Sequence, residues 1–390
     1  MSKRGNGEGT IFYHKTLKRW IGQFTAGINI DGSINRKTVY GKTRREVSEK
    51  LIAKQQEINT KTFIDKSNIV FENLAEEIIE RQYNNNLIKC SSYLRRIDTL
   101  KILKKTPIAK MKIQDISIID INTTLSSLTN YSNSSINKVN ILINNTLDYA
   151  VLNKVIPNNP YKIKGAIMKP KSNKKDKIIE ALTIDEQKAL VEELNKSNDE
   201  YKDILLIALY SGMRIGEILA LSAEDIDLKN NLIHINKSIT KTMEYITIGD
   251  TTKTYSGTRD IPILPQLMYV LKTYNNRIGL LFTNKGRLIQ PTTINSHFKK
   301  ICKDAGIKVY ITKKKKDNKY VNLKTSSVNT HMLRHTFATR CIESGMSAIV
   351  LSKILGHKSI EITLDTYTSV FNKYTEEEIQ KVTYYLSSLQ

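Results

Sequence analysis

The sequence predicts a multidomain fold in three parts: a small β-sheet with one helix, an all-α domain, and a mixed, mainly α domain with a small antiparallel β-sheet. A length of 390 residues is enough for two or three domains. Short β-rich pieces at the start give way to amphipathic helices, and a second mixed region follows a lysine-rich stretch. The predicted boundaries are 1–62, 66–160, 161–177 for a basic linker, and 178–390 for the last domain.

The charge balance predicts a polyanionic partner. The chain carries 61 Lys and Arg against 38 Asp and Glu, which is a formal net charge of +23. Each phosphate that a basic side chain neutralises releases condensed counterions. An excess of this size therefore favours a nucleic acid as the partner over the alternative of a merely basic protein.

Cysteine usage and hydropathy indicate a compartment. Three cysteines are too few, and odd in number, for a disulfide framework, which is typical of a reducing cytoplasm. The first ten residues lack the apolar region of a signal peptide. The apolar run ILLIALY is far shorter than the roughly 20 residues that span a bilayer. We therefore expect a soluble cytoplasmic protein that does not contact a membrane.

The first sixty residues predict a basic sheet and a helix. GTIFYH, RWIGQFTAG and RKTVYG are β-rich, with a hairpin-turn signal at Asp31 and Gly32. Thr43 and Glu46 form a capping-box pattern that predicts a helix through about Asn59. With 12 Lys and Arg against 5 Asp and Glu, such a sheet can lie in a DNA groove, although a solvated basic face is the alternative. The candidate DNA-binding residues here are Arg19, Arg36 and Lys37.

From about residue 71 to residue 152 the apolar spacing is helical. FENLAEEIIERQY and SSINKVNILINNTLDYAVL each place apolar residues on one face, which predicts core helices without catalytic groups. IPNNP then breaks the helix. Residues 161–177 hold seven lysines and one aspartate, which predicts a linker that lets the flanking domains close around a duplex. The candidate DNA contacts there are Lys162, Lys164 and Lys171.

The last region begins with a second capping-box pattern, formed by Thr183 and Glu186. Two helices are expected next, followed by the strand-like pieces NLIHIN, MEYITIG and RDIPIL, and then by further helices to the end. The lysine run TKKKKDNK at 312–319 shows no periodicity, so we expect a solvated loop there.

The first candidate for chemistry is an arginine in LYSGMRIGEILAL, whose apolar residues predict a buried helix. Arg214 and Glu217 are three residues apart and can therefore pair on one helix face. Pairing would hold the guanidinium rigid for a phosphate, which it can grip with two parallel hydrogen bonds. A surface salt bridge is the commoner meaning of such a pair on its own.

A second arginine lies in HMLRHTFAT, three residues after His331 on a predicted helix. His331 and His335 are four residues apart, as paired zinc ligands are. The metalloprotease pattern needs a glutamate directly after its first histidine, and here that residue is Met332. We therefore expect no metal at Arg334 and its neighbours, and we expect His335 to be a structural hydrogen-bonding residue.

TTKTYSGTRDIPI predicts a β-hairpin turn that carries Lys253. A lysine at a hairpin tip can reach into a DNA groove and meet a leaving oxygen. Lys237 and Lys241, on the preceding strand, are its rivals.

The last candidate residues for chemistry lie in LGHKSIEITLDTYTSV. Gly356 is expected to end one helix and Ser359 to begin another, with His357 between them. Tyr367 follows His357 by ten residues. A lone tyrosine on a helix is usually a packing residue, so a catalytic role for Tyr367 is indicated only by the other candidate residues together.

In chain order the set reads Arg, Lys, His-x-x-Arg, His and Tyr, which suits phosphoryl transfer without a metal. Two arginines can clamp a phosphodiester and neutralise the charge that builds on its oxygens. The histidines can donate hydrogen bonds or move protons, and the lysine can protonate the departing oxygen. The tyrosine can be the covalent nucleophile, with its proton taken by a neighbouring base.

With these motifs the C-terminal half, residues 182–371, resembles the tyrosine recombinases of the phage-integrase family. The resemblance rests on SGMRIGEILAL, the hairpin lysine, HMLRHTFAT, LGH and the terminal tyrosine, in order and with similar spacing. Residues 1–60 and 66–160 resemble, more weakly, the arm-binding and core-binding domains of integrases from phages and conjugative transposons. The catalytic residues that the resemblance implies are Tyr367, Arg214, Arg334, Lys253, His331 and His357, with Glu217 in support.

The resemblance implies site-specific strand exchange that integrates and excises a mobile element. The tyrosine forms a 3′-phosphotyrosyl link, and a 5′-hydroxyl of the partner duplex resolves it, so no ATP, metal or other cofactor is expected. Core and arm attachment sites, a homo-tetramer on DNA, and excisionase and DNA-bending accessory proteins are implied as partners. The alternatives are a type IB topoisomerase-like enzyme that relaxes DNA and a noncatalytic DNA-binding regulator with the same fold.

The last residues predict a helix with an apolar stripe. Ile379, Val382, Leu386 and Leu389 recur at helical spacing. We expect this stripe to dock onto a neighbouring protomer, with packing on its own domain as the alternative.

Overall fold

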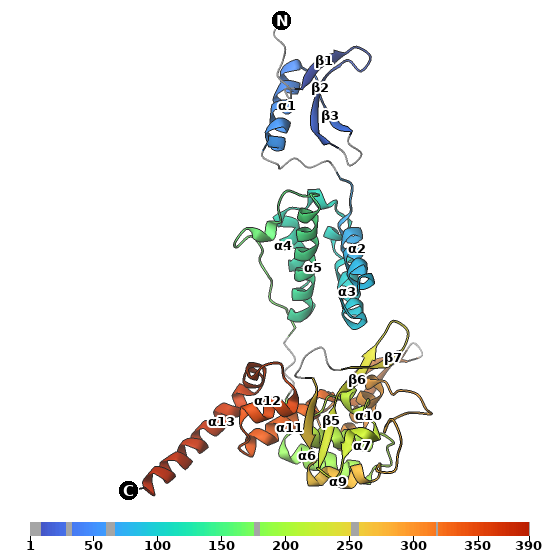
Figure 1. Ribbon diagram of the computed structural model, residues 1–390, viewed down its shortest axis with the longest axis vertical. Coiled ribbons are helices and arrows are strands. Elements are labelled where there is room, and N and C mark those ends of the chain that lie inside the picture. The colour runs from blue at the N-terminus through green and yellow to red at the C-terminus, as the bar shows by residue number, and fades with distance from the viewer. Residues whose placement is uncertain are drawn as a thin grey trace. The chain divides into compact units, whose positions relative to one another are not determined.

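The computed structural model describes residues 9–28, 33–59, 67–174, 180–250, 257–316 and 319–389. The chain forms two compact units, Met1–Asp176 and Lys177–Gln390 (Figure 1). The second unit begins one residue before the predicted start of the last domain. The finer division of the first unit near residues 62–66 stays a prediction.

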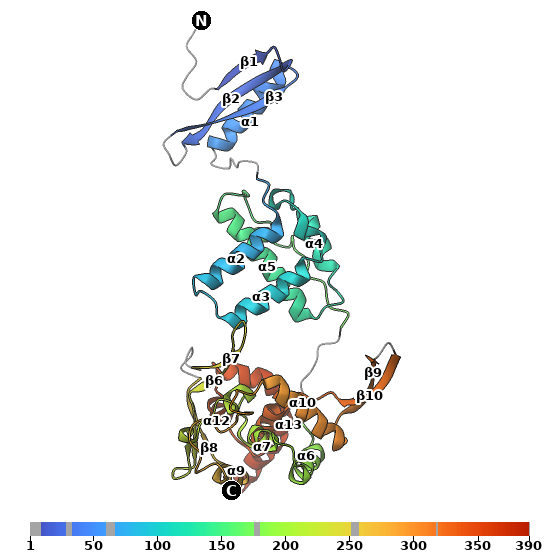
Figure 2. The same ribbon diagram turned by 90° about the vertical axis from the view of Figure 1, so that its right-hand side faces the viewer.

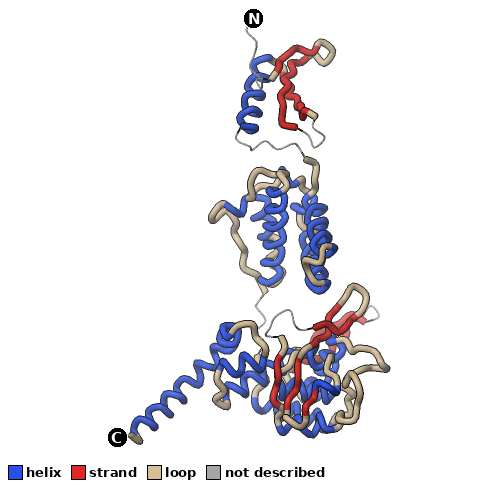
Figure 3. Tube along the Cα trace, in the orientation of Figure 1, coloured by secondary structure: helices blue, strands red, loops and turns tan. Residues whose placement is uncertain are grey.

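The chain begins with a three-stranded antiparallel sheet and one helix packed on it, red and blue in Figure 3. The strands pair in the order β1 (Thr10–His14), β2 (Arg19–Ile28) and β3 (Ile34–Gly41), and α1 spans Arg44–Asn59. Helix and sheet approach closely at Gly22, where a Cβ would lie 2.7 Å from Val47 Cγ1. The backbone amide of Glu46 donates to Thr43 Oγ1, which confirms the predicted helix start. The turn expected at Asp31 and Gly32 lies outside the described residues.

The rest of the first unit is helical. Its helices are α2 (Phe71–Asn84), α3 (Cys90–Leu103), α4 (Ile118–Ser126) and α5 (Asn133–Leu152), with 3₁₀ turns at Pro107–Lys110, Ile113–Asp115 and Pro160–Lys162. The apolar faces predicted for α2 and α5 are buried in one common core, from Phe71 to Ala150. This part of the fold therefore follows from its helical periodicity.

The stretch predicted as a linker is tied to this helical body through residue 174. Asn122 accepts from the Met168 amide and donates to the Ala166 carbonyl, and Ser172 Oγ donates to the Tyr131 carbonyl. After the 3₁₀ turn at Pro160–Lys162 its described residues form no further helix and no strand. The polar groups of this stretch bond to helix ends and loops that periodicity does not reveal, and the extent of the linker stays a prediction.

The second unit combines helices with three small antiparallel sheets. Its helices are α6 (Ile184–Lys196), α7 (Lys202–Ser211), α8 (Ile215–Ile218), α9 (Pro265–Lys272), α10 (Pro291–Asp304), α11 (His331–Glu343), α12 (Ala348–Leu355) and α13 (Ile360–Ser387), with a 3₁₀ turn at Ala223–Asp225. One sheet pairs β4 (Ile226–Asp227), β5 (Leu232–Ile235) and β8 (Arg259–Pro262), and a second pairs β6 (Lys237–Lys241) with β7 (Ile246–Asp250). The capping box of Thr183 and Glu186 is confirmed at the start of α6.

The third sheet corrects a prediction. The lysine run at 312–319 is not a loop, because it falls within a hairpin of β9 (Val309–Lys316) and β10 (Lys319–Ser326), which projects beside α10 in Figure 2. Strand-forming residues flank the run, and Thr312 pairs with Leu323. Backbone pairing that begins there continues through the lysines, whose own β propensity is low.

The second unit holds two separate apolar cores. The larger one extends from Leu182 of the segment before α6 to Leu333 of α11. The smaller one joins the second half of α11 to α12 and α13, and consists of Phe337, Ala338, Cys341, Ile342, Leu351, Leu355 and Tyr367. Tyr367 is therefore a member of a core built only from the last three helices.

Helix α13 bends at Tyr367, whose φ and ψ of −117° and 17° are not helical. Beyond this bend the helix extends away from its own unit (Figure 1). The predicted apolar stripe is exposed, with 60% of Ile379 and 66% of Leu389 accessible, so these residues do not pack on their own domain. None of the described helices is both long and apolar enough to cross a membrane.

Candidate active site

One cavity of the second unit collects residues from four places in the chain. It has a volume of about 490 Å³. It is lined by Arg214, His331, Arg334, His335, Gly356, His357, Lys358, Ile362, Thr366 and Tyr367. Five of the six predicted catalytic residues therefore meet at one surface, and the sixth, Lys253, lies outside the described residues.

Arg214 is placed by a break between two helices rather than by one continuous helix, which corrects the prediction. Gly212 ends α7 with φ of 65°, and a Cβ there would come within 2.4 Å of Phe337 Cδ1. Arg214 is then the N-cap of α8, with its amide donating to Glu217 Oε2 at 2.9 Å. The guanidinium Nη1 donates to Glu217 Oε1, also at 2.9 Å, so the predicted pair forms.

Glu217 is buried, and two arginines share its carboxylate. Nη2 of Arg259 donates to Oε2 at 2.8 Å, and Nη1 of Arg259 donates to Oε1 at 3.2 Å. Burial opposes ionisation of Glu217, but the hydrogen bonds and charges of Arg259 and Arg214 outweigh it and lower the pKa. The carboxylate is therefore ionised and leaves most donors of Arg214 facing the cavity.

Arg334 is almost fully buried in the cavity wall. Its Nη1 donates to the Gly212 carbonyl at 2.9 Å, and its Nη2 donates to the Leu355 carbonyl at 2.7 Å. A guanidinium has five N–H groups, so three remain for a ligand in the cavity. Arg334 thus joins the ends of α7 and α12 while presenting positive charge.

The histidines of the cavity are neutral at pH 7. Burial, helped by the positive charges of Arg334 and Arg214, lowers the pKa of His357 to about 4. The His331 ring opens to the cavity, but the protein atoms packed around it lower its pKa to about 4 as well. His357 Nδ1 lies 2.7 Å from Thr363 Oγ1, one turn before Tyr367 on α13. Each neutral ring keeps a nitrogen that can accept a proton.

Tyr367 lines the cavity with 4% of its surface exposed. Burial raises the pKa of its hydroxyl to about 12, despite the opposing charge of Arg334. Its ring centroid lies 5.6 Å from that of His335, which in turn is 4.8 Å from His331. A phenol with this pKa is protonated at neutral pH, so an attack by Tyr367 requires a base beside it.

Two expectations about individual residues change. His335 was expected to be a structural hydrogen-bonding residue, but no described residue bonds to its ring, and it lines the cavity between two aromatic rings. Lys237 is held by Asp225 Oδ2 at 2.7 Å and Ser222 Oγ at 2.6 Å, which makes it a weak rival of Lys253. Lys241 is exposed at the end of β6.

Residues 180–373, about half of the chain and including the whole cavity, match the family model described as "Phage integrase family". The chain belongs to the phage integrase family. Two similar proteins are a tyrosine recombinase XerC-like protein of Caldanaerobacter subterraneus and the integrase of Staphylococcus phage L54a. The first is 25% identical, covering 91% of this chain and 93% of the relative. The second is 27% identical, covering 84% and 96%.

Solved structures share the fold of this phage integrase family member. The integrase of transposon Tn1549, in complex with transposon right end DNA, matches with a TM-score of 0.64 and 19% identity, covering 81% of this chain and 100% of that one. A lambda integrase dimer bound to a core site matches with a TM-score of 0.54 and 14% identity, covering 94% and 96%. At these identities the likeness concerns the fold.

The DNA-binding residues predicted in the first unit are at its surface. Arg19 and Arg36 are exposed and Lys37 is half-buried, all on the strands of the N-terminal sheet. Lys164 and Lys171 are exposed, whereas Lys162 pairs with Asp148 at 3.0 Å. Because that pair is itself largely exposed, Lys162 stays able to exchange Asp148 for a phosphate.

The low histidine pKa values predict loss of stability in acid. His331 and His357 titrate near pH 4 when folded, against about 6.5 when unfolded, so between these values the unfolded chain binds more protons. The second unit is therefore expected to lose stability as pH falls from about 6.5 to about 4. Calorimetric melting over this range will show a smaller acid shift for His357→Gln than for the native chain. Equal acid shifts in the native chain and in His357→Gln would contradict this account.

Proposed function

We propose that this protein is a site-specific DNA recombinase that cuts and rejoins strands through a 3′-phosphotyrosyl intermediate and so integrates and excises a mobile element. The observation that carries the proposal is the cavity that groups Arg214, Arg334, His331 and His357 around Tyr367. Family membership of the same residues supports it.

In the proposed reaction the scissile phosphate occupies the cavity between the two arginines. The Tyr367 hydroxyl forms the new bond to phosphorus, the bond from phosphorus to O5′ breaks, and the departing O5′ takes a proton. The tyrosine proton passes to a neutral histidine of the cavity, and Lys253 is the proposed donor to O5′. Charge that develops on the phosphate oxygens is met by the free donors of Arg214 and Arg334. The phosphotyrosyl link keeps the bond energy for the second strand, so no ATP, metal or other cofactor is needed.

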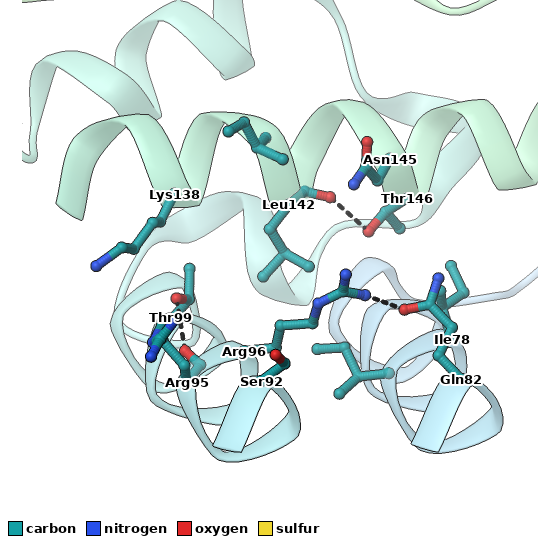
Figure 4. A pocket seen from close by; sticks show the side chains of 12 residues that line it. Ile78, Gln82, Ser92, Arg95, Arg96, Thr99, Lys138, Leu142, Asn145 and Thr146 are labelled. Carbon is teal, nitrogen blue, oxygen red and sulfur yellow. Dashed lines mark hydrogen bonds between the residues drawn. The ribbon is translucent and has the colours of Figure 1, made fainter. Parts of the chain in front are cut away.

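The first unit carries a groove lined by both basic and apolar side chains. The groove, of about 240 Å³, lies among α2, α3 and α5, and Figure 4 shows the basic side chains of Arg95, Arg96 and Lys138 in its lining together with the apolar side chain of Leu142. Arg95 and Lys138 are exposed, whereas Arg96 donates to Gln82. We propose that Arg95 and Lys138 hold phosphates of the core attachment site. The N-terminal sheet, with Arg19 and Arg36, is the proposed contact to a separate arm site.

The salt dependence of DNA binding tests this groove. Each lost phosphate contact lowers the slope of log affinity against log salt by about 0.9. Arg95→Gln combined with Lys138→Gln is therefore expected to flatten the slope by nearly 2, measured by fluorescence anisotropy on a core-site duplex. The control is Lys101→Gln on α3, because Lys101 does not line the groove. If the slope of the double variant equals that of the control, the groove does not contact the DNA phosphates.

The exposed end of α13 supports assembly on DNA. Its apolar residues have no cover within the described part of the same chain, and a neighbouring protomer can supply it. We propose a homo-tetramer that holds two duplexes, assisted by an excisionase and by DNA-bending proteins. The proposal places the protein with its DNA, which in a bacterial host is the cytoplasm.

A strand-exchange assay tests the function as a whole. The core site is first selected from random-sequence duplexes by binding, and two duplexes that carry it, one of them labelled, are then incubated with the protein in EDTA. Recombinant strands of the predicted lengths would establish the recombinase. Relaxation of supercoiled plasmid without any joined product would favour the topoisomerase-like alternative. Binding of the core site without either reaction would favour the noncatalytic regulator.

A further inference from the structure

Arg259 has three hydrogen bonds to two helices that are far from it in the sequence. It begins β8, and its side chain is only 7% exposed. Two of its nitrogens bond to the Glu217 carboxylate of α8, and its Nε donates to the Ile354 carbonyl of α12 at 2.6 Å. Arg259 is not among the residues that line the cavity, so we expect it to act through its neighbours rather than on the phosphate.

The bond to Glu217 orients Arg214. The carboxylate accepts from the backbone and side chain of Arg214, and both of its oxygens also accept from Arg259. Because Arg214 itself is 43% exposed, its conformation depends on the carboxylate that it bonds. Arg259 makes a bidentate contact to that carboxylate, which restrains the plane of the carboxylate as well as its position.

The bond to Ile354 acts on the other side of the cavity. The carbonyls of Ile354 and Leu355, at the end of α12, accept from Arg259 and Arg334 respectively. Gly356 follows with φ of 64° and His357 comes next. The two arginines therefore fix the helix end from which His357 reaches the cavity.

We propose that Arg259 is a positioning residue for strand cleavage. It holds Glu217, and through it Arg214, at a fixed position relative to the end of α12 that carries His357. This inference rests on the proposed function of the cavity. It assigns to Arg259 the alignment of two groups that approach the phosphate from different helices.

Lysine cannot replace this arginine fully. An ammonium can bond either the Glu217 carboxylate or the Ile354 carbonyl well, but it lacks the planar fork that reaches both along fixed directions. Arg259→Lys should therefore keep the charge and lose part of the alignment, whereas Arg259→Met loses both at similar length.

The test is single-turnover cleavage of a nicked core-site duplex at saturating protein, where the nick traps the covalent product. Displacing reacting groups by about 1 Å can cost about 100-fold in rate. Arg259→Met is therefore expected to cleave about 100-fold more slowly than the native chain, with an unchanged Kd for the duplex. Arg259→Lys should fall between them.

Two comparisons separate positioning from a general loss of structure. Arg340→Met removes another arginine that ties distant segments, since Arg340 donates to Gln187 and to the Leu182 carbonyl, away from the cavity. It is expected to lower the melting temperature and to keep the native cleavage rate. Arg259→Met combined with Glu217→Gln should be hardly slower than Glu217→Gln alone, because Arg259 acts largely through Glu217.

The outcomes are distinct. If the native chain forms no adduct on a duplex that it binds, the proposed function of the cavity fails first. If the native chain forms the adduct and folded Arg259→Met matches its rate, the positioning role of Arg259 is wrong. If Arg259→Met melts below the assay temperature, Arg259→Lys decides the question, and a native rate for it would overturn the inference.

Discussion

Replacing Tyr367 with phenylalanine is expected to abolish the covalent protein–DNA adduct while leaving DNA binding and folding intact. The change removes one oxygen from a ring that packs in the small core of α11, α12 and α13. That hydroxyl faces the cavity with a pKa raised to about 12 by burial, and the phenylalanine ring fills the same space. Denaturing gels of a nicked core-site duplex incubated with each protein measure the adduct.

The matched control is Tyr384→Phe, on the exposed last turns of the same helix. It is expected to form the adduct at the native rate, because its hydroxyl is outside the cavity. An adduct that persists in Tyr367→Phe would show that another residue attacks the phosphate.

Replacing each cavity arginine with glutamine is expected to slow cleavage strongly, but only one replacement should destabilise the protein. Loss of one group that stabilises developing charge typically costs about 100- to 1,000-fold in rate. Arg214 is partly exposed, and among the described residues its side chain bonds only Glu217, so Arg214→Gln should melt near the native temperature. Arg334→Gln leaves the buried Gly212 and Leu355 carbonyls short of donors, at about 1 to 3 kcal/mol for each.

Denaturant unfolding and single-turnover cleavage on the same preparations separate the two effects. Arg214→Lys is a useful companion, because it keeps the charge but loses the forked geometry, and it should remain well below the native rate. Native-like cleavage by Arg214→Gln would exclude the proposed phosphate clamp.

Local elements could be predicted from the sequence because their causes are local. Thr43 and Thr183 begin helices through side chains three residues away, and Gly356 ends α12 through its own left-handed backbone. The hairpin of β9 and β10 escaped prediction because the lysines between its strand-forming ends have no β preference of their own. The helix break before Arg214 was missed because the contact that requires Gly212 comes from Phe337, more than a hundred residues away.

The candidate site was predicted from the order and type of its residues. The hydrogen bonds that hold these residues in place became visible only in the structure. Spacing could not show that Arg334 bonds the carbonyls of two helix ends, or that Thr363 contacts His357. Arg259 was overlooked because it stands in a strand pattern, RDIPIL, whose apolar alternation explains it without a partner. Its only distinctive feature is long-range pairing with Glu217 and Ile354, which one sequence does not reveal.

The most direct test of the account is mass spectrometry of the trapped adduct. After nuclease digestion of the DNA, trypsin cleaves after Lys358 and Lys373 and releases peptide 359–373, which contains Tyr367 as its single tyrosine. The account predicts a nucleotide phosphate attached to Tyr367 in this peptide when the reaction is run in EDTA. A nucleotide attached to any other residue, or an unmodified peptide from a protein that has bound and cleaved its core site, would contradict it.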